Sequence, residues 1–353
     1  MKKNVIIFLG LNNMLTHKRG VENVIHFQSQ ACSLSFKYYI FWDSKTNVVR
    51  YDNLICIGIK KNIFWPIILN TILFKLKIRN KKIFIHSHNP LMSIILLFQT
   101  NLFTVHDGLF YLSHATQHKL NKIFWILEKI LYLRCSHIHF ISEYAKKMSL
   151  YNSKKKYTII PNTSHFENYR KDTFSKNNLK KFDKDALKIF TVRSIEERAL
   201  INLIIEVAKK LKAMKIEFLI AGKGPLLNYY RKEIEDLGLK NISLLGYVSD
   251  EDLISYYRDC NLVLIPAAYG EGFGLPIIEG YLFNKPVISS NICAIPDVII
   301  SKEFLFENTT ESIISRIKFA NEVKNIEYLD YYLNYYSNDV IFSKMNNLYA
   351  KLF

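Results

Sequence analysis

The sequence has few cysteines and no pattern that would pair them. Its five cysteines, Cys32, Cys56, Cys135, Cys260 and Cys293, are scattered along the chain, and none forms a C-x-x-C pair. A disulfide framework or a structural zinc site needs closely or regularly spaced cysteines. We therefore expect neither of these, and we expect a reducing compartment.

Long hydrophobic runs are also missing. A membrane-spanning helix needs about 18 or more apolar residues in succession, and the chain has no such uninterrupted run. The N-terminal segment MKKNVIIFLGLNN has a short apolar core and no small-residue cleavage site behind it. This favours a first β-strand over a signal peptide, so the expected location is the cytoplasm.

Acidic residues are scarce in the first half of the chain. Residues 1–164 contain 6 Asp and Glu against 23 Lys and Arg, whereas residues 165–353 contain 25 of each kind. The first half therefore carries the whole formal net charge of +17. Such an imbalance indicates an anionic partner for that half.

The bases are densest in Lys60–Lys82, KKNIFWPIILNTILFKLKIRNKK, where they alternate with aromatic and aliphatic side chains. This pattern suits the interface of an anionic membrane, where each base contributes about 1 kcal/mol. A buried helix with solvated basic ends has a similar composition and is the alternative. Nucleic acid is not expected, because no helix-turn-helix, RNP or zinc-finger pattern accompanies the bases. We expect Lys60–Lys82 to contact the inner face of the cytoplasmic membrane.

What the sequence does contain is a regular alternation of strand and helix patterns. At 353 residues with 49% hydrophobic residues, the chain is long enough for two domains, each with its own core. A polar stretch, His165–Lys184, separates two alternating series. Such alternation predicts parallel sheets covered by helices, with ligands at the carboxyl ends of the strands. The strand candidates are Asn4–Leu9, Tyr38–Trp42, Leu54–Ile57, Lys82–His86, Leu102–His106, His137–Ile141, Leu187–Val192, Glu217–Ala221, Ile242–Leu245 and Leu262–Ala267.

The most specific pattern is Tyr269–Asp297, YGEGFGLPIIEGYLFNKPVISSNICAIPD, which follows the last of these strands. Glu271 lies in its glycine-rich turn, where backbone N–H groups can face a ligand. Glu279 lies about one turn into the helix that Pro276 begins. The free N–H groups at the start of this helix suit a phosphate.

This stretch resembles the Glu-x7-Glu signature of glycosyltransferase family 4, the retaining nucleotide-sugar glycosyltransferases of the GT-B fold. The resemblance implies that Glu271 contacts hydroxyls of the donor sugar and that Glu279 holds the ribose hydroxyls. A glycine-rich turn with two incidental acids is the alternative. The implied backbone contacts to sugar and diphosphate come from Gly272, Phe273, Gly274 and Leu275.

Two arginines extend the resemblance. Arg193 and Arg198 precede a helix at the spacing where the family carries Arg and usually Lys, and there the pair neutralises the donor diphosphate. Two cations at this place would stabilise the charge that grows as the glycosidic bond breaks. Arg at the second position departs from the family but keeps the charge and adds a planar fork. Solvated arginines at a helix start are the alternative.

Glycine loops provide further points of similarity. Gly222, in the segment AGKGP, looks like the glycine loop of the family's second domain. The stretch around Gly246, Tyr247 and Val248 matches the one whose backbone receives the nucleotide base. In the family a Gly-Gly pair follows the first strand, but here only Gly20 of that pair is kept.

Histidines in the first half complete the candidate site. His106, in TVHDG at a strand end, matches the family histidine that reaches the donor sugar; a structural strand-end histidine is the alternative. His86 and His88, two positions apart on one strand, should point to one face and line the wall of the site or the acceptor path. No third ligand stands near them, so no metal site is expected. Two D-x-D patterns, Asp183–Asp185 and Asp250–Asp252, are interpreted as linker and helix start.

The sequence thus predicts a metal-independent, retaining glycosyltransferase with no cofactor beyond its nucleotide-sugar donor. The expected donor is a UDP-linked hexose or N-acetylhexosamine, such as galactose or N-acetylgalactosamine. The expected acceptor is an undecaprenyl-diphosphate-linked saccharide of O-antigen or polysaccharide biosynthesis. A GDP-mannose-dependent mannosyltransferase and a non-catalytic, basic membrane-binding protein of the same fold remain alternatives.

The resemblance also sets the expected architecture. It implies an α/β chain of the GT-B fold, with two Rossmann-like domains that face each other across a cleft. Residues 1–164 should bind the acceptor and residues 165–330 the nucleotide sugar. Residues 331–353 should form a C-terminal helix that packs back on the first domain.

Overall fold

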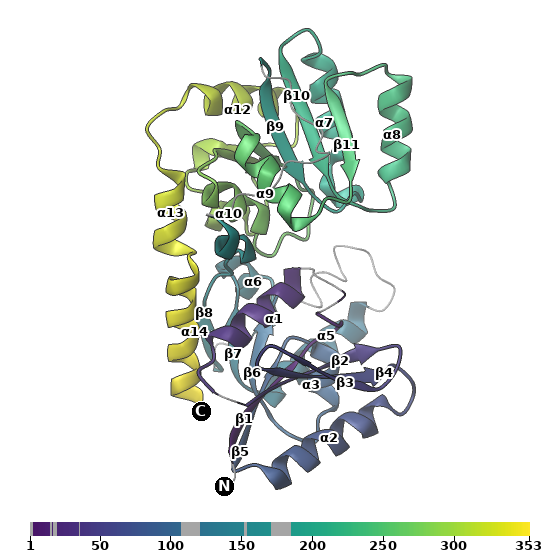
Figure 1. Cartoon of the computed structure of the whole chain (residues 1–353), viewed down its shortest axis with the longest axis vertical. Helices are drawn as coiled ribbons and strands as arrows, with labels where there is room; N and C mark the ends of the chain where they lie inside the picture. The colour runs from purple at the N-terminus through teal and green to yellow at the C-terminus, as the bar shows by residue number, and fades with distance from the viewer. Residues whose placement is uncertain are drawn as a thin grey trace. The chain divides into compact units, whose positions relative to one another are not determined.

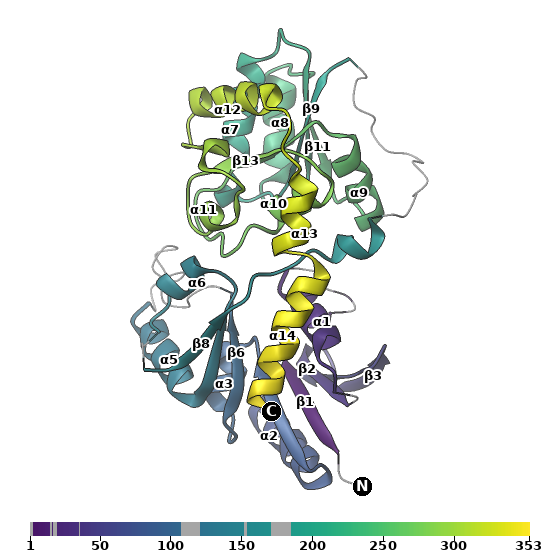
Figure 2. The same cartoon turned by 90° about the vertical axis from the view of Figure 1, so that its left-hand side faces the viewer.

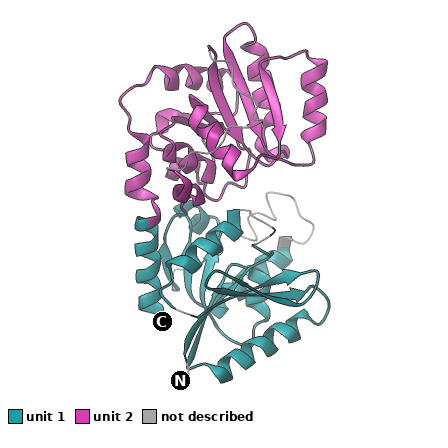
Figure 3. Cartoon of the chain, in the orientation of Figure 1, with its two compact units in different colours: residues 1–162, 339–353 teal, residues 163–338 magenta. Residues whose placement is uncertain are grey.

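The computed structural model describes residues 3–14, 16, 20–34, 36–106, 121–151, 154–170 and 185–353. The chain divides into two compact units, which Figure 3 shows in teal and magenta. Unit 1 comprises residues 1–162 and 339–353, and unit 2 comprises residues 163–338. Each unit contains one largely parallel sheet covered by helices, so the predicted α/β fold class is confirmed.

Unit 1 contains an eight-stranded sheet with the order β3-β4-β2-β1-β5-β6-β7-β8 (Figure 1). All neighbouring strands are parallel except β3 and β4, which pair antiparallel at the edge. The central strands are buried on both faces and read as nearly continuous apolar runs, as expected for a parallel sheet. The strands are β1 (Asn4–Leu9), β2 (Lys37–Asp43), β3 (Asn47–Tyr51), β4 (Leu54–Lys60), β5 (Lys82–Ser87), β6 (Thr100–Val105), β7 (Cys135–Phe140) and β8 (Lys156–Ile159).

The two faces of this sheet have separate cores. Alternate residues of β1 enter alternate cores: Ile6 and Phe8 pack with α1 and α14, whereas Val5, Ile7 and Leu9 pack with α2 and α3. Figure 2 shows α14 running beside α1 in unit 1. The helices of unit 1 are α1 (Gly20–Ala31), α2 (Trp65–Arg79), α3 (Pro90–Ile95), α5 (Asn121–Arg134), α6 (Glu143–Lys147) and α14 (Asn338–Leu352).

Unit 2 contains a six-stranded, all-parallel sheet with the order β11-β10-β9-β12-β13-β14. From β9 the chain builds outward to β11, then returns to the other side of β9 and builds outward from β12 to β14. The sheet therefore has a topological switch point between β9 and β12, where α/β proteins bind ligands. The strands are β9 (Leu187–Val192), β10 (Ile216–Ala221), β11 (Ile242–Gly246), β12 (Leu262–Ile265), β13 (Val287–Ser290) and β14 (Leu305–Phe306).

The helices of unit 2 follow its strands in the expected alternation. No helix in the described part of the chain is long and apolar enough to cross a membrane. The α-helices are α7 (Ile201–Lys210), α8 (Leu227–Asp236), α9 (Asp250–Asp259), α10 (Leu275–Leu282), α11 (Ile295–Val298), α12 (Thr310–Glu322) and α13 (Tyr328–Tyr335). The 3-10 helices are η1 (His165–Tyr169), η2 (Glu197–Ala199) and η3 (Lys302–Phe304).

Candidate donor-binding site

Two loops meet at the switch point of unit 2. One follows β9 and carries Arg193 and Arg198, and the other follows β12 and carries Glu271. The backbone N–H of Ala268 donates to the carbonyl oxygen of Arg198 at 2.9 Å. The Arg198 guanidinium donates to the carbonyl oxygen of Gly270 at 2.8 Å. These bonds join two segments that are about 70 residues apart in sequence, as neighbouring parallel strands allow.

Arg193 and Glu271 form an ion pair at this point. Nη1 of Arg193 lies 2.5 Å from Oε2 of Glu271, and the two side chains are only 6% and 15% exposed. A charged hydrogen bond in such a shielded place is stronger than a surface ion pair, and removing one partner leaves the other charge poorly compensated. The structure therefore brings together two of the residues that the sequence assigns to the donor.

Arg198 is engaged differently from Arg193. Its Nε donates to Oε1 of Glu196 at 2.9 Å, while Nη1 holds the carbonyl of Gly270. Gly270 has a positive φ of 68°, which places it in the left-handed region that glycine favours. Arg198 thus fixes the glycine-rich turn that carries Glu271. Glu196, the partner of Arg198, is not predicted from the sequence, because a glutamate at a helix start has no distinguishing pattern.

Glu279 lies on the buried side of α10 and is 8% exposed. Its Oε2 accepts a hydrogen bond of 2.7 Å from the hydroxyl of Tyr257 on α9. Burial raises the pKa of Glu279 above its usual value, while nearby His165 and the Tyr257 bond oppose the rise. Tyr257 is not among the residues expected from the sequence. A buried tyrosine hydroxyl needs a polar partner, and this requirement is the signal that could have identified Tyr257.

Backbone geometry explains why glycine stands at several positions near the site. A Cβ on Gly222 (φ +149°) would lie 1.7 Å from the carbonyl oxygen of Arg193, so only glycine lets β10 end against the loop that carries this arginine. Gly246 (φ +75°) ends β11, and its carbonyl oxygen accepts from the N–H of Gly222 at 2.8 Å. Gly274 (φ +95°) is the N-cap of α10. These three positions therefore shape the loops around the switch point.

The other predicted donor contacts lie on the same loops. Gly272 and Phe273 are buried, and the Phe273 ring packs edge-on against Tyr336 at 6.0 Å. Tyr247 is 70% exposed, with the Lys223 amine 4.3 Å from its ring centroid. Leu275 begins α10, and Val248 is partly buried.

The histidine of unit 1 stands at the carboxyl end of a strand. His106 follows β6 and is half-buried, and its Nε2 lies 2.9 Å from Nδ1 of His88. The expectation that His86 and His88 line the wall of the site is wrong, because they are only 0% and 4% exposed. Their rings do lie side by side, with centroids 4.5 Å apart. They are buried because β5 is a central strand covered on both faces.

Some expectations fall at the edge of the described structure. Gly20 is exposed at the start of α1, but the three residues before it lie outside the described residues. Asp183 lies outside as well. Asp250 and Asp252 begin α9, where the Ser249 hydroxyl accepts from the N–H of Asp252, which agrees with a helix start. Within the described ranges, no group of three or more His, Cys, Asp or Glu side chains could hold a metal ion.

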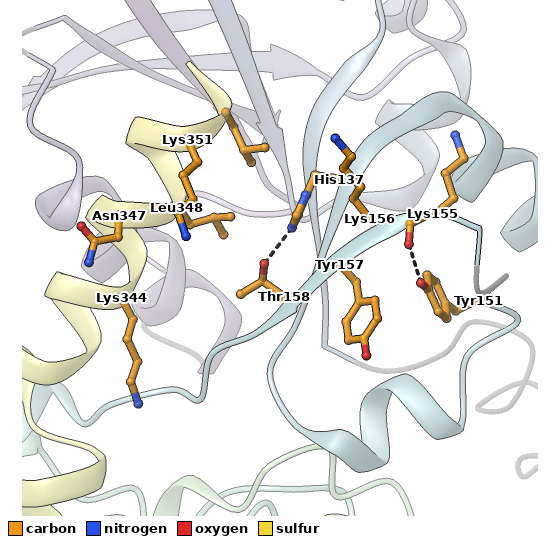
Figure 4. Close-up of a pocket in the computed structure, with 11 residues that line it drawn as sticks. His137, Tyr151, Lys155, Lys156, Tyr157, Thr158, Lys344, Asn347, Leu348 and Lys351 are labelled. Carbon is orange, nitrogen blue, oxygen red and sulfur yellow. Dashed lines mark hydrogen bonds between the residues drawn. The ribbon is translucent and has the colours of Figure 1, made fainter.

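A hollow of about 550 Å³ lies elsewhere in unit 1, between the first residues of β7 and β8 and the helix α14 (Figure 4). His137 is the third residue of β7 and Lys156 the first of β8, whereas His106 stands at the carboxyl end of β6. Lys155 donates to the carbonyl oxygens of Leu133 and Cys135 at 3.1 Å, so its amine is tied to the backbone. The hollow contains none of the residues that the sequence assigns to the donor.

The sequence model of the family described as glycosyl transferases group 1 matches residues 172–328. The chain is 24% identical over 181 residues to an uncharacterized 41.2 kDa protein in the cps region of Klebsiella pneumoniae, covering 50% of this chain and 49% of that protein. It is 34% identical over 79 residues to the O-antigen chain mannosyltransferase C of Escherichia coli, covering 22% of this chain and 21% of that enzyme.

The alignments thus span about half or less of these curated relatives. The structure of the sucrose-phosphate synthase from Thermosynechococcus elongatus matches with a TM-score of 0.78 at 14% identity, covering 99% of both chains. That likeness shows the GT-B fold for the whole chain. The segment that contains the switch point, Arg193, Glu271 and Glu279 is the one that matches the family described as glycosyl transferases group 1.

Proposed function

We propose that this protein is a glycosyltransferase that takes a sugar from a nucleotide-diphosphate donor bound at the switch point of unit 2. The observation that carries the proposal is the shielded Arg193–Glu271 pair at the carboxyl ends of β9 and β12. A cation for the diphosphate and a carboxylate for the sugar hydroxyls are held there side by side. Glu279, buried on the adjacent helix α10, is the candidate for the ribose hydroxyls.

The ion pair gives a physical account of donor binding. Before the donor arrives, each side chain neutralises the other, which limits the cost of two nearly buried charges. A diphosphate would compete for the guanidinium of Arg193, and sugar hydroxyls would donate to the carboxylate of Glu271. The positive charge of Arg193, supported by Arg198, would then stabilise the departing diphosphate as the glycosidic bond breaks.

We further propose a retaining transfer that needs no metal ion. The family resemblance supports retention, and the two arginines supply positive charge at the place where a metal-dependent enzyme would use a cation.

The identity of the donor is proposed at two levels. A UDP-linked hexose or N-acetylhexosamine remains the first expectation, with the base against the backbone of Gly246–Val248. A mannosyl donor linked to GDP is the alternative, and it is supported by the name of the O-antigen chain mannosyltransferase among the relatives.

The acceptor is proposed to be a lipid-linked saccharide at an anionic membrane surface, which unit 1 would contact through Lys60–Lys82. The region has the required apolar surface: Ile63, Phe64, Ile67 and Phe74 are 86%, 61%, 66% and 58% exposed. Exposed apolar groups in such number mark a contact surface. Bases precede and follow this surface in the sequence, as an anionic headgroup layer requires.

A donor panel tests the proposal directly. Purified protein would be incubated with UDP- and GDP-linked sugars and a synthetic prenyl-diphosphate sugar, and product formation would be measured. Arg193→Ala and Glu271→Ala should each lower turnover by about 10²–10³-fold, the usual cost of one charge-stabilising group. Near wild-type turnover in both variants would remove the assignment. If the protein binds lipid but neither transfers a sugar nor binds UDP or GDP, the alternative of a non-catalytic membrane-binding protein is favoured.

A further inference from the structure

His88 and His106 share one hydrogen bond, and that bond can be made in two ways. Nδ1 of His88 lies 2.9 Å from Nε2 of His106. A neutral imidazole has one N–H and one bare nitrogen, so either His88 donates and His106 accepts, or the reverse. Which of the two holds decides what His106 can offer a ligand at its other nitrogen, Nδ1.

Both rings are neutral at physiological pH. Burial lowers the pKa of His106 to about 3, and neighbouring His139 adds to the effect. Burial also lowers the pKa of His88 well below 6.5, helped by His86, His106 and His139. Protonated forms, in which both nitrogens would donate, therefore do not enter the choice.

The far side of His88 decides between the two arrangements. Its Nε2 is buried and has no hydrogen-bond partner among the residues that the structure describes. A proton on Nε2 would be a buried N–H with nothing to donate to, a situation that folded proteins rarely contain. A bare Nε2 leaves only an unused lone pair, and the proton then sits on Nδ1, directed at His106.

We propose that His88 is a positioning residue that donates its Nδ1–H to Nε2 of His106 and so fixes His106 in the Nδ1–H form. The remaining nitrogen of His106 is then a hydrogen-bond donor and cannot act as a base. Its ligand at Nδ1 is therefore an oxygen lone pair. His106 would orient such a ligand without taking or giving a proton.

A second hydrogen-bonded chain holds the ring of His86, which lies against His88 at an interplanar angle of 38°. His139 Nε2 lies 2.8 Å from the carbonyl oxygen of Ile160, which can only accept, so His139 carries its proton there. Its bare Nδ1 must accept from the hydroxyl of Thr104 at 2.9 Å. The Thr104 oxygen then accepts from Nε2–H of His86 at 2.7 Å, and Nδ1 of His86 accepts from the Tyr349 hydroxyl at 2.9 Å. Each proton in this chain has one place, so His86 presents a fixed, neutral ring to His88.

Nitrogen NMR of the donor-free, full-length chain tests the proposal. With ¹⁵N-labelled histidine, long-range ¹H–¹⁵N spectra distinguish a protonated from a bare ring nitrogen, and His106→Gln identifies the His106 signals. We expect a protonated Nδ1 and a bare Nε2 in His106, unchanged between about pH 5 and 8, the range in which an ordinary histidine titrates. A protonated Nε2, an average of both forms, or titration in this range would overturn the proposal.

Two matched variants test the direction of control. In Asn and Asp the terminal atoms stand as many bonds from the backbone as Nδ1 of histidine. His88→Asn keeps an N–H donor and should leave His106 as the Nδ1–H form. His88→Asp offers only acceptors and should move the His106 proton to Nε2. An unchanged His106 in a folded His88→Asp variant contradicts the proposal, and if that variant does not fold, the wild-type spectrum decides.

The test separates this inference from the proposed function. The spectra need no donor, so the tautomer stands or falls without any transfer activity. UDP or GDP can then be added to the same sample. A change in the unit 2 signals that is lost in Arg193→Ala reports on nucleotide binding alone. In an active enzyme, the pH profile of His88→Asp should gain a histidine ionisation that the wild-type profile lacks, because a carboxylate partner favours protonated His106.

Discussion

Tyr257 and Glu279 show how a single side chain can prepare a carboxylate for its ligand. The Tyr257 hydroxyl donates to Oε2 of Glu279 at 2.7 Å, and the ribose hydroxyl proposed above would bind at Oε1. Both groups are buried, and burial together with the nearby carboxylate raises the pKa of Tyr257 well above 10. The hydroxyl therefore stays a donor throughout the useful pH range, and the carboxylate keeps one fixed orientation.

Tyr257→Phe should weaken the binding of the nucleotide diphosphate that the protein accepts. Loss of a hydrogen bond to a charged group costs about 1.5–3 kcal/mol, which corresponds to roughly a tenfold to hundredfold increase in Kd. Calorimetric titration with UDP and GDP would measure the change. Tyr229→Phe, on exposed α8, is the matched control and should leave Kd unaltered. Equal affinity of wild type and Tyr257→Phe would show that Glu279 does not hold the ribose.

The amino-acid sequence selects candidate site residues more readily than it selects their hydrogen-bond partners. Arg193, Glu271 and Glu279 stand in patterns specific enough to be selected from the sequence alone. Glu196, Tyr257 and the buried state of His88 could not be selected, because each depends on a contact between elements. Hydrogen bonds of this kind are set by the packing of the sheet and have no periodicity in the sequence.

At the scale of elements, α14 is held to unit 1 by both apolar and polar contacts. Its buried side chains Ile341, Met345 and Leu348 join the core that contains α1. Tyr349, also buried, supplies the first proton of the chain that passes through His86. A polar group in this place ties the end of the chain to β5.

Tyr349→Phe should destabilise unit 1 without unfolding it. The substitution keeps the ring but leaves Nδ1 of His86 without its donor, and an unsatisfied buried polar group costs about 1–3 kcal/mol. Thermal unfolding followed by tryptophan fluorescence measures this loss. Tyr335→Phe, on an exposed position of α13 in unit 2, is the control for removing a tyrosine hydroxyl. A Tm equal to that of wild type would mean that the hydrogen-bonded chain adds nothing to stability.

The helix α2 combines the two interpretations that its sequence allows. Leu69, Leu73 and Leu76 lie on one edge and pack into the core, as an ordinary covering helix would. Ile67 and Phe74 remain largely exposed, as an interfacial helix requires. Composition could not separate the two, because α2 is apolar on nearly all sides and only tertiary packing decides which side chains are covered.

Removing exposed apolar groups from α2 and from its N-cap residue, Phe64, should therefore weaken membrane binding. Each buried phenylalanine contributes about 1.5–3 kcal/mol, so Phe64→Ser with Phe74→Ser should reduce flotation with anionic liposomes by at least roughly tenfold. The wild-type protein is expected to float with anionic liposomes and to float much less with neutral ones. Tyr229→Ser in unit 2 is the control, since it removes an equally exposed aromatic group. Flotation that ignores lipid charge and these residues would contradict a role of α2 at a membrane.

At the scale of the whole molecule, alternation of strands and helices was enough to predict two parallel-sheet units. The division points differ from the sequence-based ones for a local reason. The Tyr332 hydroxyl on α13 donates to Glu167, and the backbone N–H of Asn338 donates to the same carboxylate at 2.7 Å. These bonds keep α13 in unit 2, so the chain enters unit 1 only at residue 339.

The neutral histidines should make unit 1 sensitive to acid. Burial lowers the pKa of His106 to about 3 and of His139 to about 4, and those of His86 and His88 fall well below 6.5. Below pH 6.5 the histidines bind protons in the unfolded chain but not in the folded unit. The free energy of unfolding that they contribute is therefore fully present above this pH and decreases as the pH falls. Each such histidine contributes a slope of about 1.4 kcal/mol per pH unit.

The placement of tryptophan allows this prediction to be measured in one unit alone. All three tryptophans, Trp42, Trp65 and Trp125, lie in unit 1. Denaturant unfolding followed by tryptophan fluorescence between pH 7.5 and 5 should therefore show the loss of stability of unit 1, even where the whole chain does not unfold in one step. His139→Gln keeps hydrogen-bonding groups but cannot ionise, so its stability should depend less steeply on pH. A wild-type midpoint that stays constant down to about pH 5, where a free histidine is protonated, would mean that these rings accept protons in the folded state, and the neutral tautomers assigned to them would be untenable.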